Sequence, residues 1–143
     1  MSTVAPNFSP GSDAATLTPA LELLVSRPEA PWRLTASGEG VERSFRFKTF
    51  AKTWDFMTAV SLQCKLKNHH PEWSNVYNTA FVRWTTHNPK GLSDKDISMA
   101  VICDDLARAF GELPPESEES SSGGADLVGC AVGAAGDCCG PKK

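Results

Sequence analysis

Apolar residues along the chain recur with two periods, one of three to four residues and one of two. The helical period is clearest after Thr49, a residue type that caps helix N-termini. The apolar positions of this stripe are Phe50, Trp54, Met57, Val60 or Ser61, and Cys64. They predict an amphipathic helix that ends by about Asn68, since Pro71 disfavours helical geometry at the residue before it.

Two further helices are predicted, one on each side of this segment. Thr18 followed by Pro19 is typical of an N-cap and a first-turn proline, so we expect a short helix that ends before Pro28. Ser93, with Asp96 three residues later, matches the capping pattern at the start of a third helix. The expected buried stripe of that helix is Met99, Ile102, Cys103, Leu106, Phe110 and Leu113.

Strand patterns fill the segments between these helices. Residues 32–36 and 41–47 flank the turn sequence "SGEG" and predict a β-hairpin, with Arg43 on an otherwise apolar face. The run "NVYNTAFVRWTTH", residues 75–87, alternates as a strand or a strand pair does. One face carries Val76, Ala80, Val82 and Trp84, and the other carries Tyr77, Phe81, Arg83, Thr85 and His87.

This order of elements predicts an α+β domain in which helices cover one face of an antiparallel sheet. The domain should span residues 17–113. Residues 1–16 and 114–143 lack periodicity and contain many Pro, Ser, Gly and acidic residues, so we expect both to be disordered tails.

Composition excludes several classes of protein. The 143 residues suit one domain, and the net charge of -3 gives no general attraction to nucleic acid or to an anionic membrane. No apolar run approaches the roughly 20 residues that span a bilayer, and the N-terminus lacks the pattern of a secretory signal. We therefore expect a soluble protein of the cytoplasm or the nucleus, without membrane or direct nucleic-acid partners.

The five cysteines do not predict a disulfide framework. Cys64 and Cys103 fall within apolar helical patterns, where a small buried thiol is common. Cys130, Cys138 and Cys139 lie in the C-terminal tail at spacings that match no paired zinc knuckle.

The chain's three histidines are the candidate chemical groups. His69 and His70 precede Pro71 in a helix-to-strand connection, and an antiparallel fold can return His87 to the same place. Three interpretations remain open at this point: separate surface residues, a metal site, and general acid/base catalysis. The metal site has little support because no HExxH or CxxC motif is present, whereas imidazole can donate or accept a proton near neutral pH.

The segment "NHHPEWSNVYNTAFVRWTTHNPKGLSDKD", with "FRFKTFAKTWDFMTAV" upstream, closely resembles the pterin-4a-carbinolamine dehydratase family. The family pattern is a charged residue, three intervening residues, His-His-Pro, and then an aromatic residue, a histidine and an aspartate at set spacings. The matching positions are Lys65, His69, His70, Pro71, Tyr77, His87 and Asp96. Lys65 departs from the glutamate that many relatives have there.

The resemblance implies a four-stranded antiparallel sheet with helices on one face, assembled as a homodimer or homotetramer. It also implies the reaction: 4a-hydroxytetrahydrobiopterin loses water to give the quinonoid dihydropterin during tetrahydrobiopterin recycling. Such an enzyme is a hydro-lyase that needs no cofactor and no metal.

The resemblance also implies a set of site residues. His69, His70 and His87 would be the catalytic acid and base groups, while the choice of acid and base stays open. Pro71 would fix the loop, and Trp73 or Tyr77 would contact the pterin ring. We expect Asp96 either to orient His87 or a pterin nitrogen, or only to support the Ser93 cap, and we expect Trp84 not to touch the site.

A different function remains open on the same fold. Some animal members of the family also act as dimerisation cofactors for a homeodomain transcription factor. The alternative to an enzyme is therefore a binding module that uses an exposed helical surface to contact a transcription-factor partner.

Overall fold

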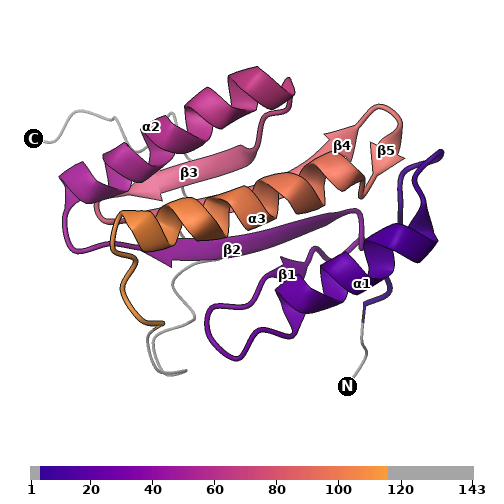
Figure 1. The fold of residues 1–143 in the computed structure, drawn as a ribbon, viewed down its shortest axis with the longest axis horizontal. Helices are drawn as coiled ribbons and strands as arrows, with labels where there is room; N and C mark the ends of the chain where they lie inside the picture. Colours follow the sequence, from indigo (N-terminus) through magenta and orange to yellow (C-terminus); the bar gives the residue numbers. More distant parts are fainter. Residues whose placement is uncertain (1–3, 116–143) are drawn as a thin grey trace, which may run out of the picture.

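The computed structural model describes residues 4–115, which form three helices and five strands (Figure 1). In chain order they are α1 (Ala14–Val25), β1 (Arg33–Leu34), β2 (Gly40–Arg46), α2 (Phe50–Lys67), β3 (Glu72–Val76), β4 (Thr79–His87), β5 (Lys90–Gly91) and α3 (Asp94–Ala109). The tail expected from residue 116 onwards, with Cys130, Cys138 and Cys139, lies outside the described residues. No helix within the described part combines the length and apolar content needed to cross a membrane.

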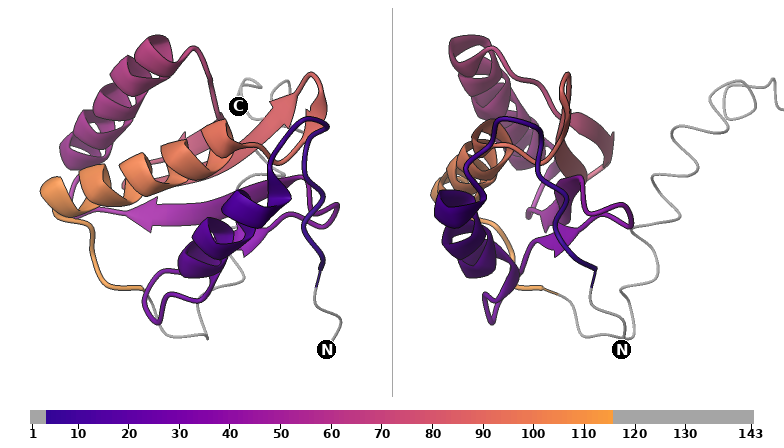
Figure 2. Two further views of the ribbon diagram at one scale, coloured as in Figure 1. Left: turned by 45° about the vertical axis from the view of Figure 1, so that its right-hand side comes forward. Right: turned by 90° about the vertical axis from the view of Figure 1, so that its right-hand side faces the viewer.

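The strands form one antiparallel sheet in the order β1-β2-β4-β3, and the short β5 pairs with the end of β4. All three helices lie on the same side of this sheet (Figure 2). The predicted α+β fold is therefore confirmed, with the two-residue β5 added to the four strands expected. The run at residues 75–87 is split because Tyr77 and Asn78 form a turn between β3 and β4.

The core lies between the sheet and the helices, because alternate side chains of a strand point to one face. Val41 and Phe45 of β2 are fully buried on that face, as are Val82 and Trp84 of β4. Phe56 of α2 packs on Phe45 with 4.8 Å between ring centroids. This packing holds α2 against the inward face of the sheet.

Helix α2 has its expected Thr49 N-cap, but part of the predicted stripe is wrong. Its buried residues are Thr53, Phe56, Met57 and Val60. Trp54 follows Thr53 by one residue, which turns its side chain about 100° away from the sheet. Trp54 is 49% exposed and Phe50 is also exposed, so α2 has apolar residues on a second, outward face.

Helix α1 starts four residues before the predicted cap. Asp13 is its N-cap and accepts a hydrogen bond from the backbone N–H of Ala15 (3.1 Å). The hydrogen bond from Thr16 lowers the pKa of the exposed Asp13 carboxyl. The Thr18 hydroxyl donates to the carbonyl of Ala14 instead of capping the helix, and Pro19 lies inside α1.

The segment before α1 packs on the fold, in contrast to the tail expected there. Phe8 forms a β-bridge with Leu92, and Ser9 donates its backbone N–H to Leu92 (2.9 Å). The Ser9 hydroxyl also donates to the carbonyl of Pro89 (2.7 Å). These contacts attach residues 7–9 to the connection between β4 and α3.

Arg43, the charged residue predicted on an apolar strand face, is buried in an ion-pair network. Its side chain is 4% exposed and pairs with Asp104 (2.6 Å) and with Glu112. The Asp104 carboxylate also accepts from the indole N–H of Trp32 (3.0 Å). Burial lowers the pKa of Arg43 to about 10 while the charge of Asp104 opposes that shift, so the guanidinium stays charged at neutral pH.

We expect the Asp104→Asn substitution to destabilise the domain by about 3 kcal/mol, because it leaves a buried cation without its main counter-charge. Urea unfolding followed by circular dichroism measures this change. Asp105→Asn is the matched control, since Asp105 is exposed and its pair with Arg108 contributes at most about 1 kcal/mol. Equal losses in the two variants would contradict the role assigned to Asp104.

Candidate active site

The histidine pair lies in the connection that ends α2. Asn68 is the C-cap residue and has left-handed backbone geometry (φ 50), which asparagine tolerates better than most residues. The backbone N–H of His69 then bonds to the carbonyl of Cys64 (3.1 Å). His70 and Pro71 come next, and β3 begins at the residue after Pro71.

His69 is held on the helix side of the sheet by a buried carboxylate. Its Nε2 lies 2.6 Å from Oδ1 of Asp96, a residue that is 0% exposed. The imidazole also stacks on Trp84, with ring centroids 5.6 Å apart and planes 23° from parallel. The expectation that Trp84 does not touch the candidate site is therefore wrong, because the inward face of β4 extends beneath the His69 ring.

Asp96 performs both of the roles considered for it, but its histidine partner is His69 and not His87. Its Oδ2 accepts from the backbone N–H of Ser93 (2.9 Å), which completes the capping box of α3. Its Oδ1 meets His69. One side chain thus starts α3 and orients the ring.

This contact determines which nitrogen of His69 is left without a hydrogen-bond partner among the described residues. An ionised carboxylate can only accept hydrogen bonds, so Asp96 accepts from each of its three partners. Nε2 of His69 therefore carries a hydrogen. No hydrogen bond from residues 4–115 reaches Nδ1. Nδ1 is therefore the nitrogen that is free to accept or donate a proton.

His70 and His87 form a second contact beside the first. Their rings meet edge to face with centroids 6.2 Å apart. His87 is exposed, and its Nε2 lies 3.6 Å from a carboxylate oxygen of Glu72, which is too long for a hydrogen bond. The structure thus pairs the accessible rings of His70 and His87, while the neighbouring His69 ring is fixed separately on Asp96 and Trp84.

A surface depression of about 440 Å³ lies at His69 and His70. Its lining residues are Cys64, Lys65, Asn68, His69 and His70. Burial raises the pKa of the Cys64 thiol, so the thiol stays protonated near neutral pH. Burial also raises the pKa of Cys103, which lies deeper in the core, although the Trp84 side chain acts in the opposite direction.

The other predicted site residues are placed differently. Trp73 is partly buried against the core. Tyr77 is 65% exposed in the turn at the opposite end of β3 from the histidines, so the structure does not bring it to them within one chain. Within residues 4–115, no group of three or more His, Cys, Asp or Glu side chains has the arrangement of a metal site.

Comparison with known proteins identifies the family. The model of the family described as pterin 4 alpha carbinolamine dehydratase matches residues 13–106. The chain belongs to this family. The match contains the histidine pair, His87 and Asp96, and ends within α3.

Several relatives and one solved structure agree with this membership. A protein of Novosphingobium aromaticivorans, provisionally named a pterin-4-alpha-carbinolamine dehydratase, is 46% identical over 54% of this chain and 79% of its own length. A relative from Prochlorococcus marinus with the same provisional name is 42% identical, over 60% of this chain and 88% of its own length. A crystal structure from Brucella melitensis, described as a transcriptional coactivator/pterin dehydratase, has a TM-score of 0.58 and 33% identity, and covers 66% of this chain and 96% of its own.

Two residues of this dehydratase-family site were missed by the sequence analysis. Trp84 contacts His69, and Thr86 contacts Asp96 through its hydroxyl (2.8 Å). The strand alternation contained a signal for both, since it puts Thr86 on the same inward face as Trp84. Which residues of that face lie next to the start of α3 could not be predicted from the sequence.

Proposed function

We propose that this family member is a 4a-hydroxytetrahydrobiopterin dehydratase that acts by histidine acid/base catalysis and serves in tetrahydrobiopterin recycling. The observation that supports this proposal most strongly is that His69 and His70 line one depression while His87 lies against the His70 ring. One ring is oriented by a buried carboxylate, and two are accessible.

The proposed reaction requires one proton to be given and another to be taken. The bond between C4a and its hydroxyl oxygen breaks, and that oxygen leaves as water once it has been protonated. The electron pair that replaces it at C4a comes from N5, which loses its hydrogen to a base. Two imidazoles in opposite protonation states satisfy this requirement without any change of oxidation state.

Lys65 stands where many relatives are expected to have glutamate, so an acid at that position cannot orient a histidine here. Asp96 provides that orientation from the start of α3 instead. The proposed chemistry is therefore compatible with a lysine at position 65.

We expect His69→Ala and His70→Ala each to lower the dehydration rate by roughly 10²- to 10⁴-fold, because each removes a proton-transfer group. The assay follows chemically generated 4a-hydroxytetrahydrobiopterin by stopped-flow absorbance, with EDTA present to test metal dependence. Melting curves verify that the variants fold. Full activity in both folded variants would contradict the assignment.

Tyr77→Ala serves as the second variant in this assay. Its predicted contact with the pterin ring requires a second copy of the chain to bring Tyr77 to the site. A raised KM for this variant would support such a contact, and unchanged kinetics would remove Tyr77 from the site.

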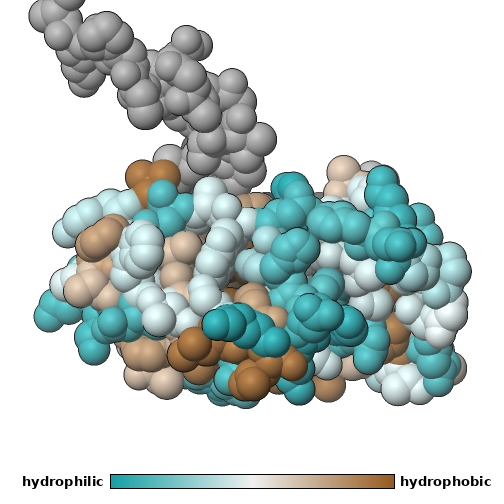
Figure 3. All heavy atoms as spheres, turned by 90° about the horizontal axis from the view of Figure 1, so that it is seen from above, coloured by the Kyte–Doolittle hydropathy of each residue, from teal (hydrophilic) through white to brown (hydrophobic). Residues whose placement is uncertain are grey.

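We also propose that the outward face of α2 joins copies of this chain into a homodimer or homotetramer. Phe50, Trp54, Leu62 and Leu66 are all exposed and follow one another along the helix at steps that are multiples of four. Figure 3 looks onto the side of the molecule on which α2 lies and shows brown apolar residues gathered at the surface. Exposed aromatic and aliphatic residues of this kind are typical of an interface.

The same face favours the alternative function. An amphipathic partner helix can bind where a second copy binds, and the Brucella melitensis neighbour is described as a transcriptional coactivator. A role as a binding module or transcriptional dimerisation cofactor therefore remains the second candidate for this chain.

We expect the double substitution Trp54→Glu and Leu62→Glu to dissociate the oligomer, because it places two carboxylates in the apolar contact. Size-exclusion chromatography with light scattering measures the mass. Lys52→Glu, on an exposed part of the same helix, is the matched control and should keep the assembly. A monomeric wild-type protein, or a variant of unchanged mass, would contradict the proposed interface.

A further inference from the structure

Thr86 contacts the oxygen of Asp96 that His69 does not occupy. Its Oγ1 lies 2.8 Å from Oδ2 of Asp96 and 2.6 Å from Oγ of Ser93. Thr86 is the second-last residue of β4, and Asp96 lies in the first turn of α3. Side chains from two elements thus meet at a carboxylate that is fully buried.

The direction of these hydrogen bonds follows from the number of hydrogens available. A hydroxyl has one hydrogen, and the ionised carboxylate can only accept, so Thr86 donates to Asp96. Ser93 then donates to Thr86, because the 3.4 Å from its Oγ to the carboxylate oxygen is a much longer contact than the 2.6 Å to Thr86. The result is a chain from Ser93 through Thr86 to Asp96, which His69 approaches from the other side.

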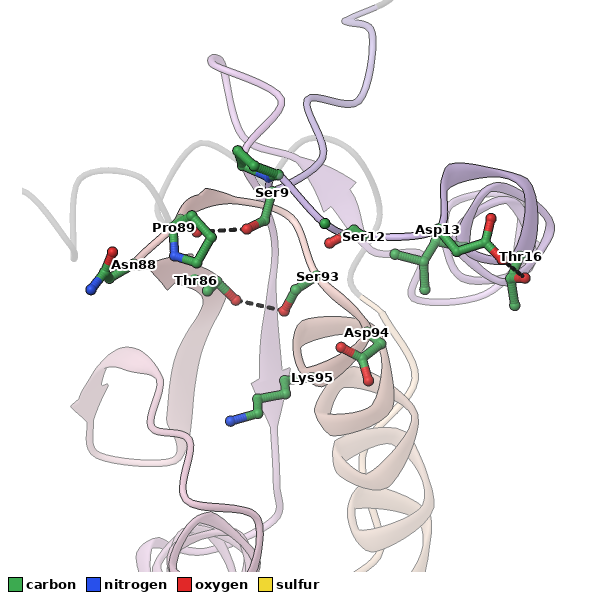
Figure 4. Close-up of a pocket in the computed structure, with 13 residues that line it drawn as sticks. Ser9, Ser12, Asp13, Thr16, Thr86, Asn88, Pro89, Ser93, Asp94 and Lys95 are labelled. Atoms are coloured by element: carbon green, nitrogen blue, oxygen red, sulfur yellow. Dashed lines mark hydrogen bonds between the residues drawn. The ribbon is translucent and has the colours of Figure 1, made fainter.

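The outer end of this chain reaches a second cavity. That cavity has a volume of about 550 Å³ and lies between the segment before α1 and the start of α3. Thr86 and Ser93 are among its lining residues, and their side chains point toward each other below Ser9 and Pro89 (Figure 4). The hydrogen-bond chain therefore links this cavity to the depression at His69.

We propose that Thr86 is a positioning residue for the dehydration: its hydroxyl holds the Asp96 carboxylate in the orientation that fixes the His69 ring. This inference rests on the proposed function for its kinetic effect. A carboxylate can rotate about the bond to its side-chain carbon, and the Thr86 hydroxyl and the Ser93 N–H together hold Oδ2 in place. With Oδ2 held, Oδ1 stays directed at Nε2 of His69, and Nδ1 stays without a hydrogen-bond partner among the described residues.

The ionisable groups around this chain come from several elements. Cys64 and Lys65 of α2 and the neighbouring His70 line the same depression as His69. Asp13, Asp94 and Lys95 line the second cavity. None of these groups takes the place of Thr86 at Oδ2, where the hydrogen-bond donors among the described residues come from Thr86 and Ser93.

Thr86→Val tests the proposal, because valine keeps the shape of threonine and removes the hydroxyl. We expect kcat to fall about tenfold with KM unchanged, since misorientation of a reacting group slows the chemical step more than it weakens binding. Thr86→Ser restores a hydroxyl and should restore most of kcat. Thr85→Val is the matched control, because its hydroxyl bonds to the Glu39 carbonyl (2.7 Å) and should leave kcat unchanged.

A second readout does not depend on activity. The Nε2 hydrogen of His69 is observed by ¹⁵N NMR, and its exchange with water should accelerate in Thr86→Val but not in Thr85→Val. Any of three results would overturn the proposal. They are unchanged kcat and exchange in Thr86→Val, equal losses in both valine variants, and a Thr86→Ser variant that does not restore kcat and slow exchange. A wild-type protein without dehydratase activity would overturn the proposed function, and the exchange measurement alone would then decide the role of Thr86.

Discussion

The arrangement of the candidate site depends on one buried negative charge, that of Asp96. A carboxylate in a protein interior is costly unless hydrogen bonds and a nearby positive or polar group compensate it. Here the compensating groups are the Ser93 N–H, the Thr86 hydroxyl and the His69 ring. These partners come from the start of α3, the end of β4 and the connection after α2. The interaction that satisfies the carboxylate therefore also fixes the relative positions of the three segments that build the site.

The sheet has a second buried charge, whose role is structural. Arg43 of β2 pairs with Asp104 of α3 and with Glu112 beyond it. Helix α3 is thus fixed to the sheet by Asp96 in its first turn and by Asp104 towards its other end. The first contact involves a histidine that lines a depression and leaves its Nδ1 without a hydrogen-bond partner among the described residues, whereas the second has all of its charged groups engaged. Only the first has the accessibility that catalysis requires.

Much of the fold could be predicted from the sequence, because local signals specify it. The Thr49 and Ser93 caps and the strand alternation gave the correct order of helices and strands. The start of α1 was misplaced because the hydrogen bonds of Asp13 outweigh the signal of Thr18 and Pro19. The link between Asp96 and His69 spans 27 positions and depends on how α3 packs on β4, so no local pattern reveals it.

The position of the proton on the His69 ring shows whether Asp96 fixes that ring. In the neutral ring, ¹⁵N chemical shifts distinguish a hydrogen on Nε2 from one on Nδ1. We expect His69 to carry its hydrogen on Nε2 in nearly all molecules, while the exposed His87 shows a mixture in the same spectrum. A His69 ring with the hydrogen on Nδ1, or a mixture like that of His87, would contradict the claim that Asp96 fixes the ring for catalysis.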